Sequence, residues 1–337
     1  MAGRRTNLAL LMVLASALLT GTVAFASGTA AGRWVVIAHG VVGLGLIVLL
    51  PWKSVIVRRG LRRRRTRRRT ERWTSVGFGV LVLTAVVTGV LHSGWSRLLP
   101  GGLTTMQVHV GAALAAIPLG VWHVVARPVR PRRTDLSRRT ALRTAGGAAL
   151  AGAVWLSAEA LWRTTSAPGA DRRFTGSHEV GSDDPAAMPV TQWFTDRVPR
   201  IEAIRWRLHL TDGHGARTLA LDDLGRTDQV RATLDCTGGW FAHQEWSGVR
   251  LDRLVDPAGG DSLLIRSATG YTRRLPIEDL ATLLLATRVG GAPLSAGHGF
   301  PARLVVPGRR GFWWVKWVTD IRVDSVPPWA QPPFPLT

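Results

Sequence analysis

Five apolar segments, separated by loops rich in arginine, occupy the first half of this sequence. They cover residues 8–26, 34–52, 74–92, 106–126 and 141–162. A helix needs about 20 predominantly apolar residues to cross the hydrocarbon core of a bilayer. The sequence therefore predicts five transmembrane helices. The fifth segment is the least apolar, because it contains three glycines and Glu159.

The distribution of charge predicts the orientation of these helices. Residues 1–170 hold 23 of the 43 basic residues but only three of the 22 acidic ones, whereas residues 171–337 hold 20 basic and 19 acidic residues. Arginine-rich loops beside membrane spans stay on the cytoplasmic side, so the basic blocks at 53–72 and 127–143 place the N-terminus inside. We expect contact with membrane lipid and no nucleic-acid binding. A role of the first block in binding nucleic acid or anionic lipid is the alternative.

Two segments resemble export signals. The first apolar segment is similar to a cleavable signal peptide, but cleavage would remove one helix of the repeat described next. The segment 137–143 (SRRTALR) resembles a twin-arginine signal; a simple basic flank of a membrane helix is the alternative. We expect three parts: a four-helix membrane domain over 1–126, a cytoplasmic basic loop and fifth helix over 127–165, and an extracytoplasmic domain over 170–337 of a protein in the cytoplasmic membrane.

The second and fourth apolar segments match each other at an offset of 70 residues. His39 aligns with His109, Lys53 aligns with His123, and three apolar or aromatic positions between them are identical. The segments that precede them share a Thr-Gly pair near the outer end. A duplicated two-helix hairpin accounts for this pattern.

The repeat places two histidines at one depth in the membrane, where such residues usually serve a function. Two imidazoles that face each other are what axial haem ligation needs, and interhelical hydrogen bonding is the alternative. His109 and His123 are 14 residues apart, on nearly one face of a helix, a spacing similar to that in membrane cytochromes b. Because Lys53 replaces a second inner histidine, we expect one haem b near the outer surface. Its ligands would be His39 and His109, with His92 or His123 as the alternative.

The second half of the chain has the pattern of a mainly β α+β domain. Strands are expected at 205–211, 263–267, 302–306 and 317–323, and short helices at 220–224, 251–256 and 276–285. The fold class is therefore an all-α membrane bundle followed by a mainly β domain. Cys236 is the one cysteine of the chain, so no intramolecular disulfide forms.

Four motifs lie in and after the segment of Cys236. They are 236–240 (CTGGW), 246–251 (WSGVRL), 297–303 (GHGFPAR) and 315–317 (VKW). In this order and spacing, over residues 174–324, they resemble the sulfite oxidase family of molybdopterin-dependent oxidoreductases, which includes the periplasmic methionine-sulfoxide reductase catalytic subunit. The resemblance implies that Cys236 is the thiolate bound to molybdenum and that Thr237 and Gly238 lie against the cofactor. A soft thiolate suits such a metal.

The resemblance also implies which side chains hold the pterin and its phosphate. They are His298, Arg303 and Lys316, with Arg197 as a looser match. Lys316 is one of two lysines beside 41 arginines, which favours a point-charge contact with phosphate.

The sequence differs from the family at a position that binds the substrate in sulfite-oxidising members. Sulfite-oxidising members carry an arginine five residues after the cysteine, where this chain has Phe241. Together with Trp240 and His243, this residue indicates a less charged substrate, such as a sulfoxide or an N-oxide, unless the three side chains only pack. We expect a membrane-bound molybdenum-cofactor oxidoreductase that transfers an oxygen atom in a two-electron reaction. The haem would connect it to the quinone pool or another membrane electron carrier.

Two other readings of the sequence remain open. The first is a sulfite-oxidising enzyme of the same family that uses its helices only as an anchor. The second is a membrane-anchored binding protein that keeps the molybdenum fold without catalysis.

Overall fold

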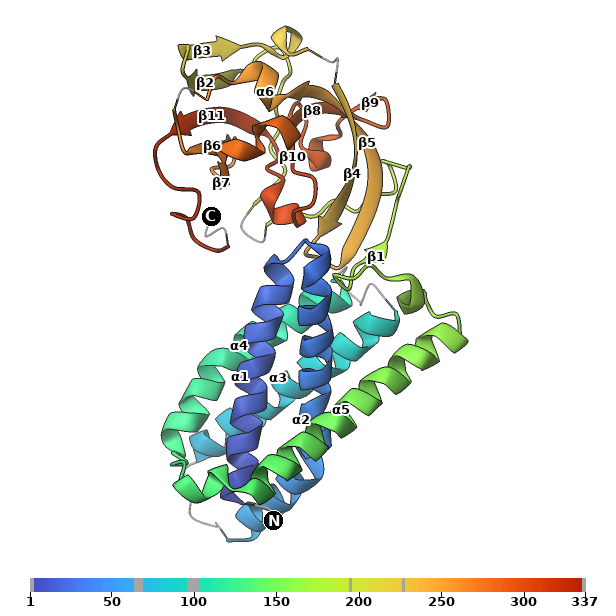
Figure 1. Ribbon diagram of the computed structural model, residues 1–337, viewed down its shortest axis with the longest axis vertical. Coiled ribbons are helices and arrows are strands. Elements are labelled where there is room, and N and C mark those ends of the chain that lie inside the picture. Colours follow the sequence, from blue (N-terminus) through green and yellow to red (C-terminus); the bar gives the residue numbers. More distant parts are fainter. Residues whose placement is uncertain are drawn as a thin grey trace. The chain divides into compact units, whose positions relative to one another are not determined.

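The chain divides into two compact units, which we call the helical unit (Met1–His178) and the strand unit (Glu179–Thr337). The computed structural model describes residues 3–63, 69–95, 103–193, 196–225, 228–257 and 259–334. Helices make up the first unit, and strands with short helical turns make up most of the second (Figure 1).

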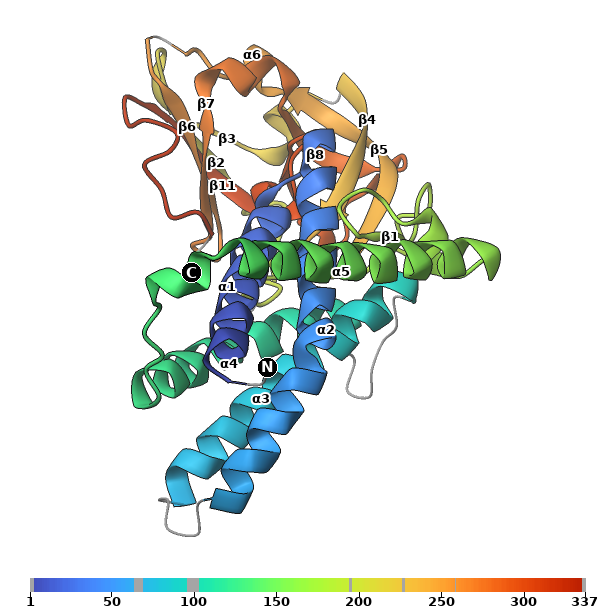
Figure 2. The ribbon, with the colours of Figure 1, turned by 60° about the horizontal axis from the view of Figure 1, so that its bottom comes forward.

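The helical unit contains five long helices. They are α1 (Arg4–Ala26), α2 (Arg33–Arg63), α3 (Arg69–Gly94), α4 (Thr105–Ala126) and α5 (Arg138–Thr164). α1 packs along α2, α3 packs along α4, and α5 packs along α2 (Figure 2). Among the described helices, four are long and apolar enough to cross a membrane: Arg4–Ala26, Ala30–Arg59, Trp73–Gly94 and Thr105–Ala126. They coincide with the first four predicted spans, whereas the fifth span stays a prediction.

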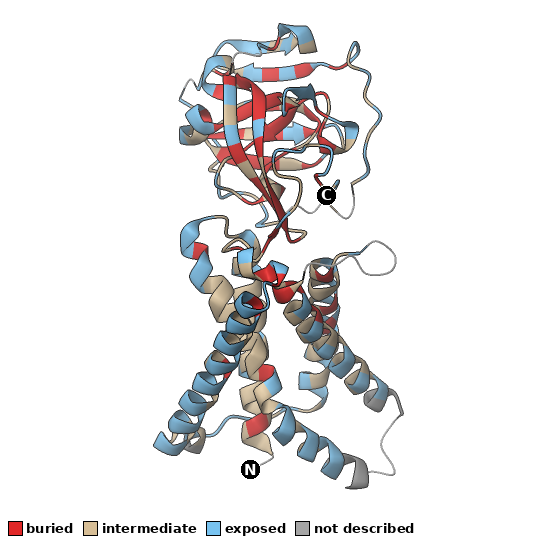
Figure 3. Ribbon diagram, turned by 90° about the vertical axis from the view of Figure 1, so that its right-hand side faces the viewer, coloured by how far each residue is buried: buried red, intermediate tan, exposed pale blue. Residues whose placement is uncertain are grey.

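The outer surface of the helices is apolar. Leu19 is 67% exposed, Leu83 is 55% exposed and Val125 is 73% exposed. Exposed residues run along the helices, while buried residues concentrate in the strand unit (Figure 3). Helices that are apolar on most sides are typical of a membrane-spanning part.

Helix α5 joins opposite ends of the helical unit. Just before its start, Asp135 accepts a hydrogen bond from Arg4 Nη2 at 2.7 Å and one from Arg5 Nε at 3.2 Å, at the start of α1. The backbone N–H of Arg132, together with Arg4, holds the pKa of the Asp135 carboxyl below its usual value. Near the other end of α5, the Trp162 ring meets the ring of Trp95, which follows α3, with centroids 4.7 Å apart.

The strand unit is built from two sheets. The first has six strands: β1 (His178–Glu179), β4 (Asp228–Cys236), β5 (Trp240–Arg250), β8 (Leu284–Val289), β9 (Ala292–Pro293) and β10 (Arg303–Val305). The second has the order β3 (Gly215–Leu219), β2 (Leu208–Asp212), β11 (Val318–Asp324), β6 (Ser262–Ser267) and β7 (Thr272–Pro276). β11 pairs with β2 in parallel and with β6 antiparallel. This mixed, mainly β architecture agrees with the predicted class.

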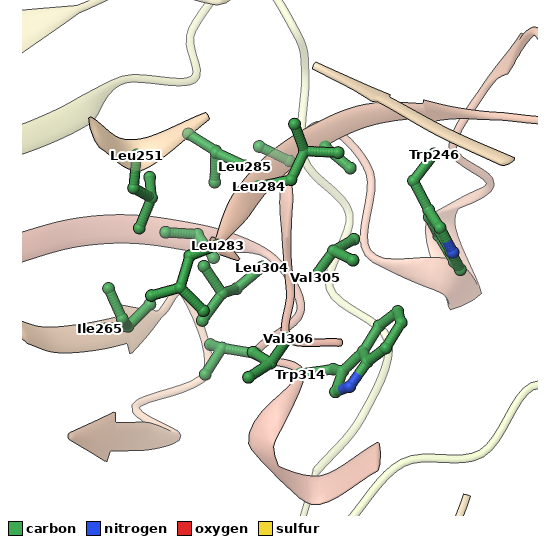
Figure 4. Packing of buried hydrophobic residues seen from close by; sticks show 14 of the residues in the cluster. Trp246, Leu251, Ile265, Leu283, Leu284, Leu285, Leu304, Val305, Val306 and Trp314 are labelled. Atoms are coloured by element: carbon green, nitrogen blue, oxygen red, sulfur yellow. The ribbon is translucent and has the colours of Figure 1, made fainter. Parts of the chain in front are cut away.

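The core of the strand unit lies around β8. Leu283, Leu284 and Leu285 are each 0% exposed, so both faces of this strand are covered. Trp246 and Trp314 belong to the same cluster (Figure 4). The helix predicted over 276–285 is wrong at its C-terminal end, because residues 284 and 285 belong to β8. Only Ile277–Thr282 is helical, as a 3-10 turn, before β8 begins.

Candidate functional site

Cys236 ends β4 at the tight turn that leads into β5. Cys236 and Trp240 are register partners in the antiparallel β4–β5 ladder, so their side chains share one face of the sheet. Gly239 has a φ of 92°, a left-handed conformation that suits glycine in this turn. The Gly238 N–H donates to Cys236 Sγ at 3.3 Å, and the Thr191 hydroxyl lies 3.2 Å from the same sulfur. The half-buried sulfur is thus held by two polar groups.

The thiol and the neighbouring indole lie close together beside Gly238. A Cβ added at Gly238 would lie 3.5 Å from Cys236 Sγ and 3.7 Å from Trp240 Nε1. Trp240 is 4% exposed, and its buried Nε1 has no hydrogen-bond partner among the described residues. Because an unpaired buried donor is costly, this N–H indicates an acceptor supplied by a bound group.

A buried ion pair fixes the backbone of the cysteine. Arg310 Nη1 donates to Asp235 Oδ1 at 2.6 Å, and both side chains are 4% exposed. Arg310 Nη2 also donates to the Cys236 carbonyl at 3.2 Å. A Cβ at Gly311 would lie 3.2 Å from Cys236 Cα, so this glycine permits the close approach of the two segments.

Two buried cations lie near the thiol. Arg303 is 1% exposed and lies over the ring of Trp246 at 5.0 Å, a geometry that stabilises a desolvated guanidinium. Its Nη1 donates to the His298 carbonyl at 3.0 Å, while its Nε has no partner among the described residues. Lys316 Nζ donates to the Thr191 carbonyl at 2.7 Å and to the Gly297 carbonyl at 2.6 Å. Thr191 therefore contacts both the thiol and one of the cations.

Burial makes these charges costly. Desolvation, reinforced by Arg303, lowers the pKa of Lys316 to about 7, and desolvation lowers the pKa of Arg303 to about 9. The pKa of His298 falls to about 4 through burial and then through the charges of Arg303 and Lys316, so its imidazole is neutral near pH 7. Two adjacent desolvated cations are stabilised by a bound anion such as a phosphate.

In the helical unit, two histidines make equivalent contacts. His39 Nδ1 lies 3.0 Å from the Ala17 carbonyl, and His109 Nδ1 lies 2.7 Å from the Ala85 carbonyl. A carbonyl only accepts, so each Nδ1 carries the proton and each Nε2 presents a lone pair. The two ring centroids are 5.8 Å apart, with an interplanar angle of 83°.

A glycine packs against each of these rings. A Cβ at Gly21 would lie 2.9 Å from His39 Cε1, and a Cβ at Gly89 would lie 3.0 Å from His109 Nδ1. The Thr-Gly pairs that the sequence repeat contains are therefore the places where the rings approach the neighbouring helix.

The other two histidines predicted as alternative haem ligands, His92 and His123, contact polar groups of the protein. His92 Nδ1 lies 3.2 Å from Thr105 Oγ1, and His92 Nε2 lies 3.0 Å from the Gly176 carbonyl. His123 Nδ1 lies 3.2 Å from Ser75 Oγ. A metal bond to His92 would require the loss of one of its two contacts.

Comparison with known proteins identifies part of the strand unit. Residues 195–330 match the family model for the oxidoreductase molybdopterin binding domain. The strand unit contains an oxidoreductase molybdopterin-binding domain. The match confirms the predicted molybdopterin-binding oxidoreductase class for this domain, while the resemblance to the methionine-sulfoxide reductase subunit and the fusion to a cytochrome b-like membrane domain stay predictions.

Relatives of the molybdopterin-binding domain include sulfite oxidases. The chain is 29% identical over 167 residues to mitochondrial sulfite oxidase of Rattus norvegicus, a match that covers 38% of this chain and 31% of the relative. It is 32% identical over 96 residues to the uncharacterized oxidoreductase YuiH of Bacillus subtilis (strain 168), covering 26% of this chain and 48% of the relative. The crystal structure of the sulfane dehydrogenase SoxCD from Paracoccus pantotrophus shares 27% identity over 38% of this chain and 40% of that chain, with a TM-score of 0.36. The chain spans about a third of the length of the sulfite oxidases that it matches.

Most residues predicted to bind the cofactor gather in the molybdopterin-binding domain. Thr237 and Gly238 are half-buried in the turn after Cys236. Lys316 reaches the thiol's neighbourhood through Thr191, and Arg303 and His298 are hydrogen bonded to each other. Arg197 is different. It is exposed in a loop, and among the described residues it has no hydrogen bond or ion pair to this group.

The three aromatic residues predicted near the substrate separate onto two faces. Trp240 shares the face of Cys236, whereas Phe241 is the register partner of Asp235 and therefore lies on the opposite face. His243 is also on that opposite face, where its ring lies 5.3 Å from the ring of Phe241. Only Trp240 is in position to meet a substrate at the thiol.

Sequence reasoning missed Thr191, Asp235 and Arg310. Thr191 carries no motif, and it contacts a cysteine 45 positions away. Asp235 directly precedes Cys236 in the sequence. An acidic residue near the end of a buried strand needs a hydrogen-bonding or charged partner, so this position could have predicted a buried ion pair.

Proposed function

We propose that this protein is a membrane-bound molybdenum-cofactor oxidoreductase that catalyses two-electron oxygen-atom transfer. The observation that carries the proposal is the group around Cys236 Sγ, in which an unpaired buried indole N–H and two buried cations lie near the thiol in a molybdopterin-binding domain. These residues fit the cofactor, because they offer one thiolate for the metal and positive charge for a phosphate. When bound, the molybdenum cofactor supplies two-electron exchange with the substrate.

The chain's own residues then have distinct roles. Cys236 is the metal ligand, and the Gly238 N–H and the Thr191 hydroxyl stabilise its negative charge by donating to the sulfur. Arg303 and Lys316 hold the pterin phosphate. The backbone carbonyl of His298 orients Arg303 by accepting a hydrogen bond from its Nη1.

The substrate we propose is a neutral sulfoxide or N-oxide. The cations near the thiol are already assigned: Arg303 and Lys316 to the phosphate, and Arg310 to Asp235. In the reduction, the S–O bond of a sulfoxide breaks, sulfur gains two electrons, and the oxygen leaves as water with two protons. A second candidate, the oxidation of sulfite and water to sulfate with release of two electrons and two protons, is favoured by the 29% identity to rat sulfite oxidase.

We further propose that a haem b in the helical unit carries the electrons. His39 and His109 would be its axial ligands, because each presents a free Nε2 and each ring packs against a glycine. The two hairpins support a duplication, since the Asn7–Lys53 contact at 3.2 Å is the counterpart of the Ser75–His123 contact at 3.2 Å. When bound, haem supplies one-electron transfer, and the oxidation of a membrane quinol to a quinone releases the two electrons and two protons that sulfoxide reduction consumes.

Helix α5 is proposed to be the fifth span, which puts the molybdopterin-binding domain on the extracytoplasmic side of the cytoplasmic membrane. Its start contacts the start of α1 and its end contacts the end of α3, as expected for a helix that crosses once more. Its acid, Glu159, is paired with Arg172, which reduces the cost of a charge near the membrane surface. A twin-arginine signal at 137–143 would export the domain with its cofactor.

Metal analysis and a reduced-minus-oxidised absorption spectrum of the purified protein test the proposal, for wild type and Cys236→Ser. We expect about one molybdenum per chain in wild type, its loss in Cys236→Ser, and a b-type haem spectrum in both. Folded wild type without molybdenum, from a host that makes the cofactor, would leave a membrane-anchored binding protein. Molybdenum without a haem spectrum would leave the helices as an anchor.

The substrate is tested on the same sample. Reduced viologen with dimethyl sulfoxide or trimethylamine N-oxide measures reduction, and ferricyanide with sulfite measures oxidation. Turnover of sulfite alone would refute the proposed direction in favour of the second candidate.

A further inference from the structure

We propose that the indole N–H of Trp240 donates a hydrogen bond to the substrate oxygen that is removed at the molybdenum site. This inference rests on the proposed function and names the group that recognises its substrate. Trp240 and Cys236 are register partners on one face of the β4–β5 ladder, at its closed end. A Cβ built on Gly238 would lie 3.5 Å from Cys236 Sγ and 3.7 Å from Trp240 Nε1, so the thiol and the indole lie close together on this face. A substrate oxygen at a metal held by Cys236 would therefore lie beside the indole.

Four other buried tryptophans of the strand unit differ from Trp240 in the hydrogen bonding of the indole N–H. Within the described part of this unit, the buried indoles of four further residues each donate to a backbone carbonyl: Trp206 to Val318, Trp246 to Ala232, Trp314 to Arg309 and Trp317 to Ala296, at 2.8–3.3 Å. Trp240 Nε1 is buried and has no partner. The fold satisfies these four N–H groups but not that of Trp240, which favours a donor kept for a ligand.

The uncharged indole also explains why the site would prefer a neutral substrate whose oxygen accepts a hydrogen bond. A single N–H binds the oxygen of a sulfoxide or an N-oxide without adding positive charge, whereas an arginine would favour an anion such as sulfite. The guanidinium of Arg310, which also lies at this end of the ladder, is paired with Asp235. Trp240 is therefore the residue that we expect to set substrate class.

The test compares wild type with Trp240→Phe, which keeps the aromatic ring and removes the donor. Binding is measured with dimethyl sulfone, a neutral molecule whose oxygens accept hydrogen bonds but are not transferred to the enzyme. The measurement is a ligand-observed NMR titration of the molybdenum-loaded full chain. Removal of one neutral hydrogen bond should weaken binding about 5- to 10-fold. The value of kcat/KM for dimethyl sulfoxide, with reduced viologen as the electron donor, should fall by a similar factor, while molybdenum and pterin content stay the same.

Two control variants separate this role from packing. Trp206→Phe removes a partnered indole donor and should lower the unfolding midpoint without changing sulfone binding, because its N–H donates to Val318. Trp329→Phe changes an indole that is 81% exposed and should change neither. Trp240→Phe should lower the unfolding midpoint less than Trp206→Phe does, since both leave a cavity but only Trp206→Phe also loses a hydrogen bond.

Two outcomes would overturn the inference. Equal sulfone binding by wild type and Trp240→Phe would show that water satisfies the N–H, and loss of molybdenum or pterin in Trp240→Phe would show that the cofactor is the acceptor. If Trp240→Phe does not fold, β-(benzothien-3-yl)alanine at this position removes the N–H with the ring shape retained. A wild type that binds the sulfone but reduces neither a sulfoxide nor an N-oxide would refute the proposed function, while the binding comparison would still decide the role of Trp240.

Discussion

Replacing Asp235 by asparagine removes the charge that pairs with buried Arg310 next to Cys236. Both side chains are 4% exposed and the ion pair is 2.6 Å long. Breaking one partner of a buried pair leaves an uncompensated charge, and this costs about 3–5 kcal/mol. The freed guanidinium also holds the Cys236 carbonyl, so we expect Asp235→Asn to lower molybdenum content as well as stability.

Asp183→Asn is the matched control. Asp183 pairs with Arg231 at 2.7 Å, nearly the same distance, but both side chains are 61% exposed. Solvent screens such a pair, and its loss costs about 0–1 kcal/mol. The two variants therefore change the same chemical group and differ mainly in burial.

Urea unfolding of the detergent-solubilised chain, followed by tryptophan fluorescence, measures both free energies. A double variant, Asp235→Leu with Arg310→Met, should recover most of the loss, because apolar groups of similar volume replace a buried pair at little cost. Equal destabilisation by Asp235→Asn and Asp183→Asn, or a double variant less stable than Asp235→Asn, would refute this reasoning.

Three further predictions concern charge, haem and topology. The pKa of Lys316 is lowered to about 7 in the fold but is about 10.4 in the unfolded chain. Between these pH values the cofactor-free folded chain binds fewer protons than the unfolded chain. Its stability should therefore rise with pH, by about 2 kcal/mol from roughly pH 7 to 9. Lys316→Met should remove this contribution in urea titrations at the two pH values, and an unchanged slope would contradict it. His109→Ala should abolish the b-type haem spectrum and His123→Ala should retain it; the reverse result would move the haem to the inner side. Alkaline phosphatase fused after residue 170 should be active and after residue 130 inactive; equal activity of the two fusions would exclude the fifth span, and the opposite pattern would reverse the orientation.

The strands differ in how far the sequence could predict them. β6 and β11 lie within one residue of their predicted ranges, because alternation of polar and apolar residues marks a strand with one covered face. β8 was missed and its start was assigned to a helix. Its leucines are buried on both faces, and a continuous apolar run has no period that separates a buried strand from a helix.

The sequence by itself determined the local features of this protein. The four apolar helices follow from the length and hydropathy of each segment, since transfer into a bilayer depends on the residues of that segment alone. The turn at Cys236 follows likewise from two adjacent glycines. Only the tertiary structure brought Thr191 to the thiol, paired Asp235 with Arg310, and left the N–H of Trp240 unpaired. These features depend on contacts between segments 45 to 75 residues apart and on the register of β4 with β5, which no local pattern of residues specifies.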